Sequence, residues 1–173
     1  MEQFKYNNLI LYKDNSVWGD GTHCTTIGCT ELLKKLDLKN KKVLDIGTGT
    51  GVQSIMAKKL GAEEVLAIDI NPGAIGLGEY NAKINNVNID FKLILEDEKI
   101  NYKADVVVAN LSPHILIKYL YNIHDYMNPG CKIITSMTNE FNMMVEINNS
   151  KCGLKIVDKY VGDTYSVFLL EEE

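Results

Sequence analysis

The chain has 173 residues, which is enough for one domain with a full hydrophobic core but too few for a second domain of ordinary size. Its formal net charge is -5, and its basic residues form no cluster beyond adjacent pairs, which argues against a nucleic-acid partner. No apolar run approaches the roughly 20 residues of a membrane span, and the N-terminus lacks the features of a signal peptide. We therefore expect a cytoplasmic protein without a membrane partner.

The cysteines are scattered along the chain and include no Cys-x-x-Cys pair. This distribution predicts reduced thiols rather than a disulfide framework or a zinc site. His23 beside Cys24 comes nearest to a metal-binding pattern, but its spacing does not favour a metal. The four cysteines are Cys24, Cys29, Cys131 and Cys152.

Residues 18–26 read Trp-Gly-Asp-Gly-Thr-His-Cys-Thr-Thr and precede a helix with apolar residues at helical spacing. Glycines beside hydroxyl groups and a histidine indicate a loop that approaches a ligand closely, with Thr25 or Thr26 capping the helix. A plain turn with an N-cap is the alternative interpretation. We expect residues 1–40 to form a loop and helix that cover a site, and residues 41–173 to form the sheet core.

Strand and helix patterns alternate after residue 40, which is typical of a parallel sheet wound with helices. The expected strands are 42–46, 64–68, 90–95, 104–109, 131–136, 154–161 and 165–170. The expected helices are 52–60, 72–85, 115–127 and 140–149. A short turn at 162–164 predicts that the last two strands form an antiparallel hairpin. The predicted fold is therefore α/β, with a Rossmann-like seven-stranded sheet, mostly parallel, and helices on both faces.

The strand at 42–46 runs into a loop with glycines at 47, 49 and 51, and the strand at 64–68 ends at Asp69. Val52 stands where a dinucleotide fingerprint has its third glycine, which disfavours an NAD-dependent oxidoreductase. Asp45, at the mouth of the loop, would repel a pyrophosphate and attract a cation. Asp69 is placed to accept hydrogen bonds from two ribose hydroxyls. These features indicate S-adenosylmethionine, which carries an ammonium, a sulfonium and no phosphate.

Four segments resemble the ribosomal protein methyltransferase family called PrmA. Residues 18–26 are similar to its F-G-T-G-T-H-x-T-T loop, and residues 45–51 to its D-x-G-x-G-x-G segment. Residues 65–72 are similar to its V-x-x-I-D-I-x-P segment, and residues 108–111 to its A-N-I or A-N-L turn. The resemblance covers roughly residues 16 to 170. It implies a class I methyltransferase that uses S-adenosylmethionine to methylate protein amino groups, chiefly lysines of a large-subunit ribosomal protein.

The resemblance also implies roles for individual positions. Thr22 and its loop neighbours would contact the methionine end of the cofactor, Asp69 the ribose, and Asn110 the reacting region. No metal site is expected. The residues expected to bind the cofactor are Thr22, Thr25, Asp45, Gly47, Thr48, Gly49, Gly51, Asp69, Ile70 and Asn110.

The chain departs from the family pattern in two respects. Trp18 and Asp20 replace the phenylalanine and the first threonine of the family's loop, which adds an acid near the expected pocket. Only about fifteen residues precede the loop, so we expect the family's N-terminal substrate-recognition domain to be missing.

Methyl transfer from a sulfonium is a direct displacement, so orientation and desolvation contribute most of the catalysis. Asn110 is the expected catalytic residue, because its side-chain carbonyl can accept an N–H of the amine and hold the lone pair in line. The turn reads Asn110-Leu111-Ser112-Pro113-His114 and lacks the aromatic residue that usually stacks a flipped base. His114 and His23 are alternative candidates for a base.

Two other functions remain open on the sequence alone. The short chain favours a small-molecule methyltransferase or a non-catalytic subunit that binds S-adenosylmethionine, whereas Asn110 and the loop at Thr22 favour a protein methyltransferase. Asp97, beside Glu96, is a weaker candidate for a contact with adenine.

Overall fold

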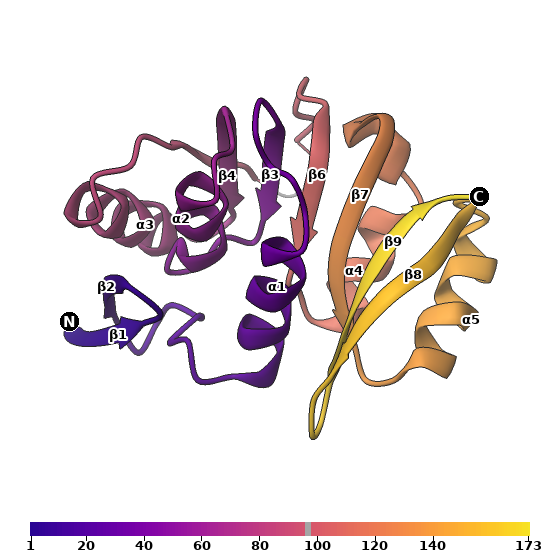
Figure 1. The fold of residues 1–173 in the computed structure, drawn as a ribbon, viewed down its shortest axis with the longest axis horizontal. Coiled ribbons are helices and arrows are strands. Elements are labelled where there is room, and N and C mark those ends of the chain that lie inside the picture. The colour runs from indigo at the N-terminus through magenta and orange to yellow at the C-terminus, as the bar shows by residue number, and fades with distance from the viewer. Residues whose placement is uncertain (96–97) are drawn as a thin grey trace.

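The computed structural model describes residues 1–95 and 98–173, and a sheet of seven strands lies at its centre (Figure 1). The strands are β3 (Lys42–Ile46), β4 (Glu64–Asp69), β5 (Asp90–Leu93), β6 (Ala104–Ala109), β7 (Met127–Met137), β8 (Leu154–Val161) and β9 (Ser166–Glu172). They lie in the order β5-β4-β3-β6-β7-β9-β8. β3 to β7 pair in parallel, whereas β9 runs antiparallel to β7 and β8. The predicted sheet, including its closing hairpin, is confirmed.

Helices cover both faces of this sheet, as predicted. They are α1 (Cys24–Lys34), α2 (Val52–Lys59), α3 (Pro72–Ile84), α4 (Pro113–Leu120) and α5 (Glu140–Ser150), with a 3-10 turn η1 (Ile123–Tyr126). Side chains alternate along β3, because successive residues of a strand point to opposite faces. Val43 packs with α1 and α2, whereas Leu44 and Ile46 pack with α4 and α5. α3 shares a cluster of buried residues with α2 and contacts β4 and β5.

The segment predicted as one helix over 115–127 is a shorter helix, a 3-10 turn and the start of a strand. α4 ends at Leu120, and β7 begins at Met127 instead of residue 131. Ile123 and Met127 are buried in the same core cluster as Leu120, so apolar residues recur at helical spacing beyond the end of the helix. Because this spacing is the pattern of a helix, the prediction extended the helix to residue 127, which was wrong. β5 is also shorter than predicted and ends at Leu93.

An N-terminal hairpin precedes the predicted loop and was not expected from the sequence. Its strands are β1 (Glu2–Tyr6) and β2 (Leu9–Lys13), joined by a two-residue turn in which Asn7 has φ +52°. Asparagine is favoured in such turns because it tolerates positive φ. Leu9 and Leu11 are buried against residues of α2. The hairpin therefore shares a hydrophobic cluster with the rest of the fold.

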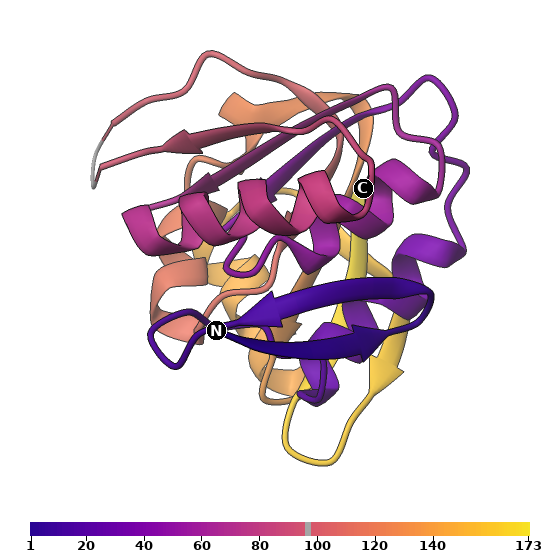
Figure 2. The ribbon, with the colours of Figure 1, turned by 90° about the vertical axis from the view of Figure 1, so that its left-hand side faces the viewer.

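Asn81 of α3 and Asn85, the residue that caps its C-terminus, hold the free edge of β2. Figure 2 shows the hairpin of β1 and β2 beside α3. The Oδ1 of Asn81 accepts from the backbone N–H of Tyr12 at 2.8 Å, and its Nδ2 donates to the Tyr12 carbonyl at 2.9 Å. Asn85, one turn further on, makes the same pair of bonds with Ile10 at 3.1 and 2.7 Å. A side-chain amide carries one acceptor and two donors, so each asparagine pairs with the strand edge as a neighbouring strand would.

A buried carboxylate supports the loop that follows β3. Asp45 is 1% exposed, and its Oδ2 accepts from the hydroxyls of Thr48 at 2.8 Å and Ser54 at 2.5 Å. These bonds tie the end of β3 to the loop and to the first turn of α2. Burial raises the pKa of Asp45 to about 6, although the hydrogen bonds from Ser54 and Thr48 act in the opposite direction.

We predict that Asn81→Ala lowers the free energy of unfolding by about 1 to 3 kcal/mol, because the partly buried N–H and carbonyl of Tyr12 lose their partner. Asn81 is fully buried, whereas Asn149 is an exposed residue of helix α5. Asn149→Ala is therefore the matched control for the change in helix propensity. Urea denaturation of both variants measures the difference. A loss for Asn81→Ala no larger than for the control would contradict the hydrogen-bonded clamp.

A second prediction concerns the pH dependence of stability. Because the pKa of Asp45 is raised from 3.8 to about 6 on folding, the native state binds its proton more tightly than the unfolded state does. The contribution of Asp45 to stability therefore falls as pH rises from about 4 to about 6 and stays constant above that range. Relative to Asp45→Asn, the unsubstituted protein should lose up to about 3 kcal/mol of its free energy of unfolding as the pH rises through this range. A difference between the two proteins that is independent of pH would refute this.

Candidate active site

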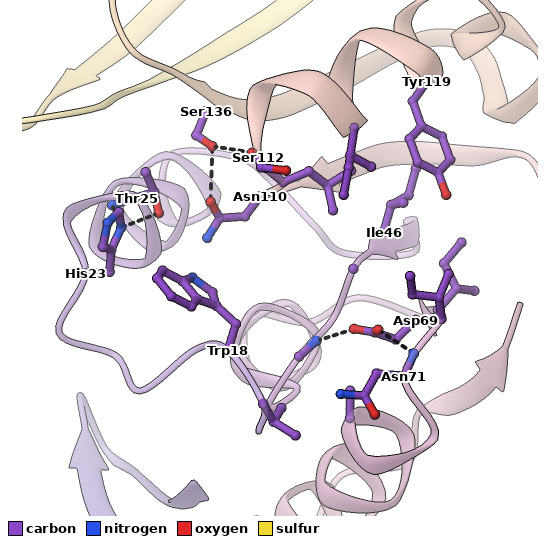
Figure 3. Close-up of a pocket in the computed structure, with 18 of the residues that line it drawn as sticks. Trp18, His23, Thr25, Ile46, Asp69, Asn71, Asn110, Ser112, Tyr119 and Ser136 are labelled. Atoms are coloured by element: carbon purple, nitrogen blue, oxygen red, sulfur yellow. Dashed lines mark hydrogen bonds between the residues drawn. The ribbon is translucent and has the colours of Figure 1, made fainter. Parts of the chain in front are cut away.

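A cavity of about 510 Å³ opens at the carboxyl ends of β3, β4 and β6 (Figure 3). β3 lies at the point of the sheet where chain order reverses, with β4 on one side and β6 on the other. Ligands of open α/β sheets bind in the crevice outside the strand ends at such a point. The volume lies within the range of small-molecule sites.

The loop after β3 passes between two parts of the chain at very short range. Gly47 has φ +73° and Gly49 has φ +54°. A Cβ at Gly47 would lie 2.3 Å from the side chain of Leu111, and one at Gly49 would lie 2.3 Å from the Trp18 carbonyl oxygen. Both positions require glycine, because a side chain would meet neighbouring atoms and favour a different backbone conformation.

The carboxylate of Asp69 is held in the cavity wall by two backbone groups. Its Oδ2 accepts from the N–H of Gly49 at 3.0 Å, and its Oδ1 accepts from the N–H of Asn71 at 2.9 Å. The first bond links β4 to the glycine loop, and the second fixes the turn that enters α3. Each oxygen keeps a further lone pair for a ligand, so Asp69 can present two acceptors in a fixed orientation.

The loop before α1 forms another wall and is attached to the glycine loop. The Trp18 carbonyl accepts from the N–H of Thr50 at 3.0 Å, and the Thr50 hydroxyl donates to the Gly19 carbonyl at 2.6 Å. The side chain of Thr22 donates to Asp20 at 2.7 Å and does not line the cavity. Trp18 lines it and remains 67% exposed.

The cap of α1 differs from the prediction. His23, rather than Thr25 or Thr26, is the N-cap residue, and its Nδ1 accepts from the backbone N–H of Thr25 at 3.3 Å. The hydroxyl of Thr25 lies 2.8 Å from the same nitrogen. An imidazole nitrogen can replace the usual oxygen acceptor at a cap, which propensities for serine and threonine do not anticipate. His23 and Thr25 both line the cavity, and the ring of His23 lies 5.5 Å from that of Trp18.

Asn110 reaches the cavity from the turn after β6. Ser136, at the end of β7, places its hydroxyl oxygen 3.2 Å from the Asn110 Oδ1 and 3.4 Å from the Leu111 carbonyl oxygen. His114, the other histidine considered as a base, is exposed and does not line the cavity. Ser136 was not identified from the sequence, because it meets Asn110 only through the pairing of β6 with β7.

The predicted cofactor residues divide into two groups. Those that line the cavity are Thr25, Gly47, Gly49, Asp69, Ile70 and Asn110. Those that do not line it are Thr22, Asp45, Thr48 and Gly51. Asp45 was expected to face the ligand, but its buried carboxylate points to the hydroxyls behind the loop. Asp97 and Glu96 lie outside the described residues.

Apolar side chains make up much of the cavity wall. Among the described lining residues there is no lysine or arginine, and Asp69 is the one carboxylate. Within the described ranges, no cluster of three or more His, Cys, Asp or Glu side chains could hold a metal. No helix in those ranges is both long and apolar enough for a membrane span. The site can therefore hold an apolar ligand that offers hydroxyl donors to Asp69.

Comparisons with known sequences point to one family. The family described as "Ribosomal protein L11 methyltransferase (PrmA)" matches residues 8–163. The protein of that name from Dictyoglomus turgidum is 35% identical over 167 residues, which cover 95% of this chain and 56% of the relative. The one from Haemophilus influenzae strain KW20 is 50% identical over 103 residues, covering 59% of this chain and 35% of the relative. The chain thus spans about half the length, or less, of these relatives.

Solved structures share the fold. A ribosomal protein L11 methylase from Lactobacillus delbrueckii subsp. bulgaricus has a TM-score of 0.79 and 24% identity, covering 92% of this chain and 84% of its own. A tRNA m1G37 methyltransferase from M. jannaschii has a TM-score of 0.77 and 27% identity, covering 98% of this chain and 53% of its own. The fold is that of class I methyltransferases. With the family match over most of its length, the chain belongs to the ribosomal protein L11 methyltransferase (PrmA) family.

Proposed function

We propose that the cavity binds S-adenosylmethionine and that the protein transfers the methyl group to an amine of a protein substrate, with ribosomal protein L11 as the first substrate to test. The observation that carries this proposal is the shared cavity of Asp69 and Asn110, in a chain of this family. Asp69 offers carboxylate oxygens that can accept hydrogen bonds from a ribose. Asn110 offers a side-chain amide that can bind the amine to be methylated.

The residues present fit an adenosyl group. Asp69 would hold the two ribose hydroxyls, because its carboxylate is already oriented by the N–H groups of Gly49 and Asn71. Ile70 and Ile94, which line the cavity beyond Asp69, would pack against the adenine ring. Gly47 lets the backbone approach the ligand closely. This division of the cavity leaves Asn110 and the loop at Trp18 for the methionine and methyl end.

The polar residues behind the glycine loop would support the site from outside the cavity. Thr48 and Asp45 hold the loop through their hydrogen bond, and Thr22 holds the loop before α1 through Asp20. Thr25 would serve the methionine end directly, because it lines the cavity beside His23. Thr25, Gly47 and Gly49 would thus contact the cofactor, whereas Thr22, Asp45 and Thr48 would act as positioning residues.

When bound, S-adenosylmethionine supplies a methyl group on a sulfonium that a nucleophile displaces directly. The protein's part is to bring a neutral amine into line and exclude water. An apolar cavity lowers the pKa of an entering ammonium, because desolvation disfavours its charged form. Asn110 can then accept one N–H of the amine through Oδ1 and hold its lone pair in line.

A nitrogen of a nucleic-acid base is the second candidate acceptor. The tRNA m1G37 methyltransferase from M. jannaschii covers 98% of this chain at 27% identity, which favours this candidate. The formal net charge of -5 and the absence of lysine and arginine from the described cavity wall oppose it. Binding to polyanions depends largely on cations that contact phosphates. We therefore place the protein amine first.

We predict that Asp69→Ala raises the Kd for S-adenosylhomocysteine about 30-fold or more, because hydrogen bonds to a charged group are worth roughly 1.5 to 3 kcal/mol each. Asp90→Ala, which removes an exposed carboxylate from the neighbouring strand β5, is the matched control. Calorimetric titration measures both. Equal affinities in the two variants would show that the ribose binds elsewhere.

A further prediction tests the reaction itself. Labelled S-adenosylmethionine should transfer its methyl group to ribosomal protein L11, and Asn110→Ala should lower kcat about 10- to 100-fold with the Kd of the cofactor changed less than about twofold. A cell extract treated in the same way and separated into protein, RNA and metabolite fractions is the parallel assay. Label in RNA or metabolites alone, or full activity of Asn110→Ala, would contradict the proposed function or the proposed residue.

A further inference from the structure

Two hydroxyl groups of β7 reach across to the turn that carries Asn110. Thr135 donates to the Ala109 carbonyl at 2.9 Å, and the hydroxyl of Ser136 lies within reach of both the Asn110 Oδ1 and the Leu111 carbonyl oxygen. Ser136 is 3% exposed and lines the cavity. Figure 3 shows the Asn110 Oδ1 turned toward Ser136 and its Nδ2 turned away from it.

The hydroxyl of Ser136 has one proton and two neighbouring acceptors, so it can serve only one of them at a time. A rotation of the Asn110 amide by half a turn removes this conflict. Nδ2 would then donate to the Ser136 oxygen, while the Ser136 hydroxyl donates to the Leu111 carbonyl. In that arrangement the Ser136 hydroxyl and the Leu111 carbonyl both have partners, and the Asn110 Oδ1 faces the cavity, where an amine can donate to it.

The direction of this amide matters for an amine nucleophile. An N–H of Asn110 that faces the amine would bond to the lone pair that must attack the methyl group. A carbonyl that faces the amine accepts one of its N–H groups instead and leaves the lone pair free. Only the rotated amide can therefore assist the transfer.

We propose that Ser136 is a positioning residue that holds Asn110 with Oδ1 toward the acceptor amine, an inference that rests on the proposed function. The Leu111 carbonyl is essential to this role, because it takes the hydroxyl proton and leaves the Ser136 oxygen free to accept from Asn110. Ser136 can therefore donate to Oδ1 in the unliganded protein, as the structure has it, and accept from Nδ2 once the amine has entered, and in that second state it holds Oδ1 toward the amine.

A double-mutant cycle tests the proposal, with kcat and KM measured on ribosomal protein L11 at saturating S-adenosylmethionine. Ser136→Ala should lower kcat about tenfold with little change in KM, because the amide loses the partner that directs it. In an Asn110→Ala background the same substitution should have less than about a twofold effect. Ser136→Thr keeps the hydroxyl and should recover most of the lost rate.

Thr135→Val is the matched control, since it removes the neighbouring hydroxyl, which bonds to Ala109 and not to Asn110. Thr135→Val should change kcat by the same factor whether or not Asn110→Ala is present. If Ser136→Ala lowered kcat by the same factor with and without Asn110→Ala, the proposal would be overturned. It would also be overturned if Thr135→Val were coupled to Asn110→Ala as strongly as Ser136→Ala is. Absence of methyl transfer by the unsubstituted protein would instead refute the proposed function, and this inference with it.

An NMR measurement on the unliganded protein tests the contact between Ser136 and Asn110 without requiring methyl transfer. The side-chain amide signal of Asn110 can be assigned in ¹⁵N spectra of the unliganded protein by its loss in Asn110→Ala. Ser136→Ala should shift this signal, and Thr135→Val should leave it in place. An Asn110 signal unaffected by Ser136→Ala in a folded protein would show that the serine does not hold the amide.

Discussion

The site depends on the hydrogen bond between the backbone N–H of Gly49 and the carboxylate of Asp69. This bond connects the loop after β3 with the end of β4, and the Asn71 N–H fixes the other carboxylate oxygen. The loop also passes close to the Trp18 carbonyl, and it can do so only because Gly49 has no side chain, since a Cβ there would meet that oxygen. The N–H groups of Gly49 and Asn71 together thus fix the direction of the one carboxylate among the described lining residues.

The N-terminal segment completes the cavity because it is bound to the core at several points. Asn81 and Asn85 hold the edge of β2, and the Trp18 carbonyl accepts from Thr50 in the glycine loop. Asn81 also donates to the carbonyl of Thr50, so the hairpin and the loop share one partner. Stability of the hairpin and geometry of the cavity are therefore coupled through α3.

The elements that local pattern and turn chemistry determine could be predicted from the sequence. The glycine loop and the placement of Asp69 follow from buried strands with short turns, and both were found where expected. The N-terminal hairpin was missed because its strands are short and partly exposed and depend on the side chains of Asn81 and Asn85. Ser136 was missed because its contact with Asn110 arises from strand pairing across the sheet.

Asp45 shows the limit of reasoning from sequence position. Its place before the glycine loop suggested a contact with a cationic ligand, but the preference of Thr48 and Ser54 hydroxyls for a buried acceptor turns it away from the cavity. The position of a residue along a strand predicts which loops and strands lie near it. The direction in which its side chain points depends on its hydrogen-bond partners. The carboxylate therefore stabilises the loop through hydrogen bonds that the alternating strand pattern does not reveal.

The most direct test of the account is a crystal structure of the protein with S-adenosylhomocysteine. We expect the two ribose hydroxyls to lie within hydrogen-bond distance of the Asp69 oxygens while the Gly49 and Asn71 bonds persist. We also expect the sulfur to lie on the side of the cavity that Asn110 faces. A ligand seated away from Asp69, or a carboxylate turned out of the cavity, would contradict it.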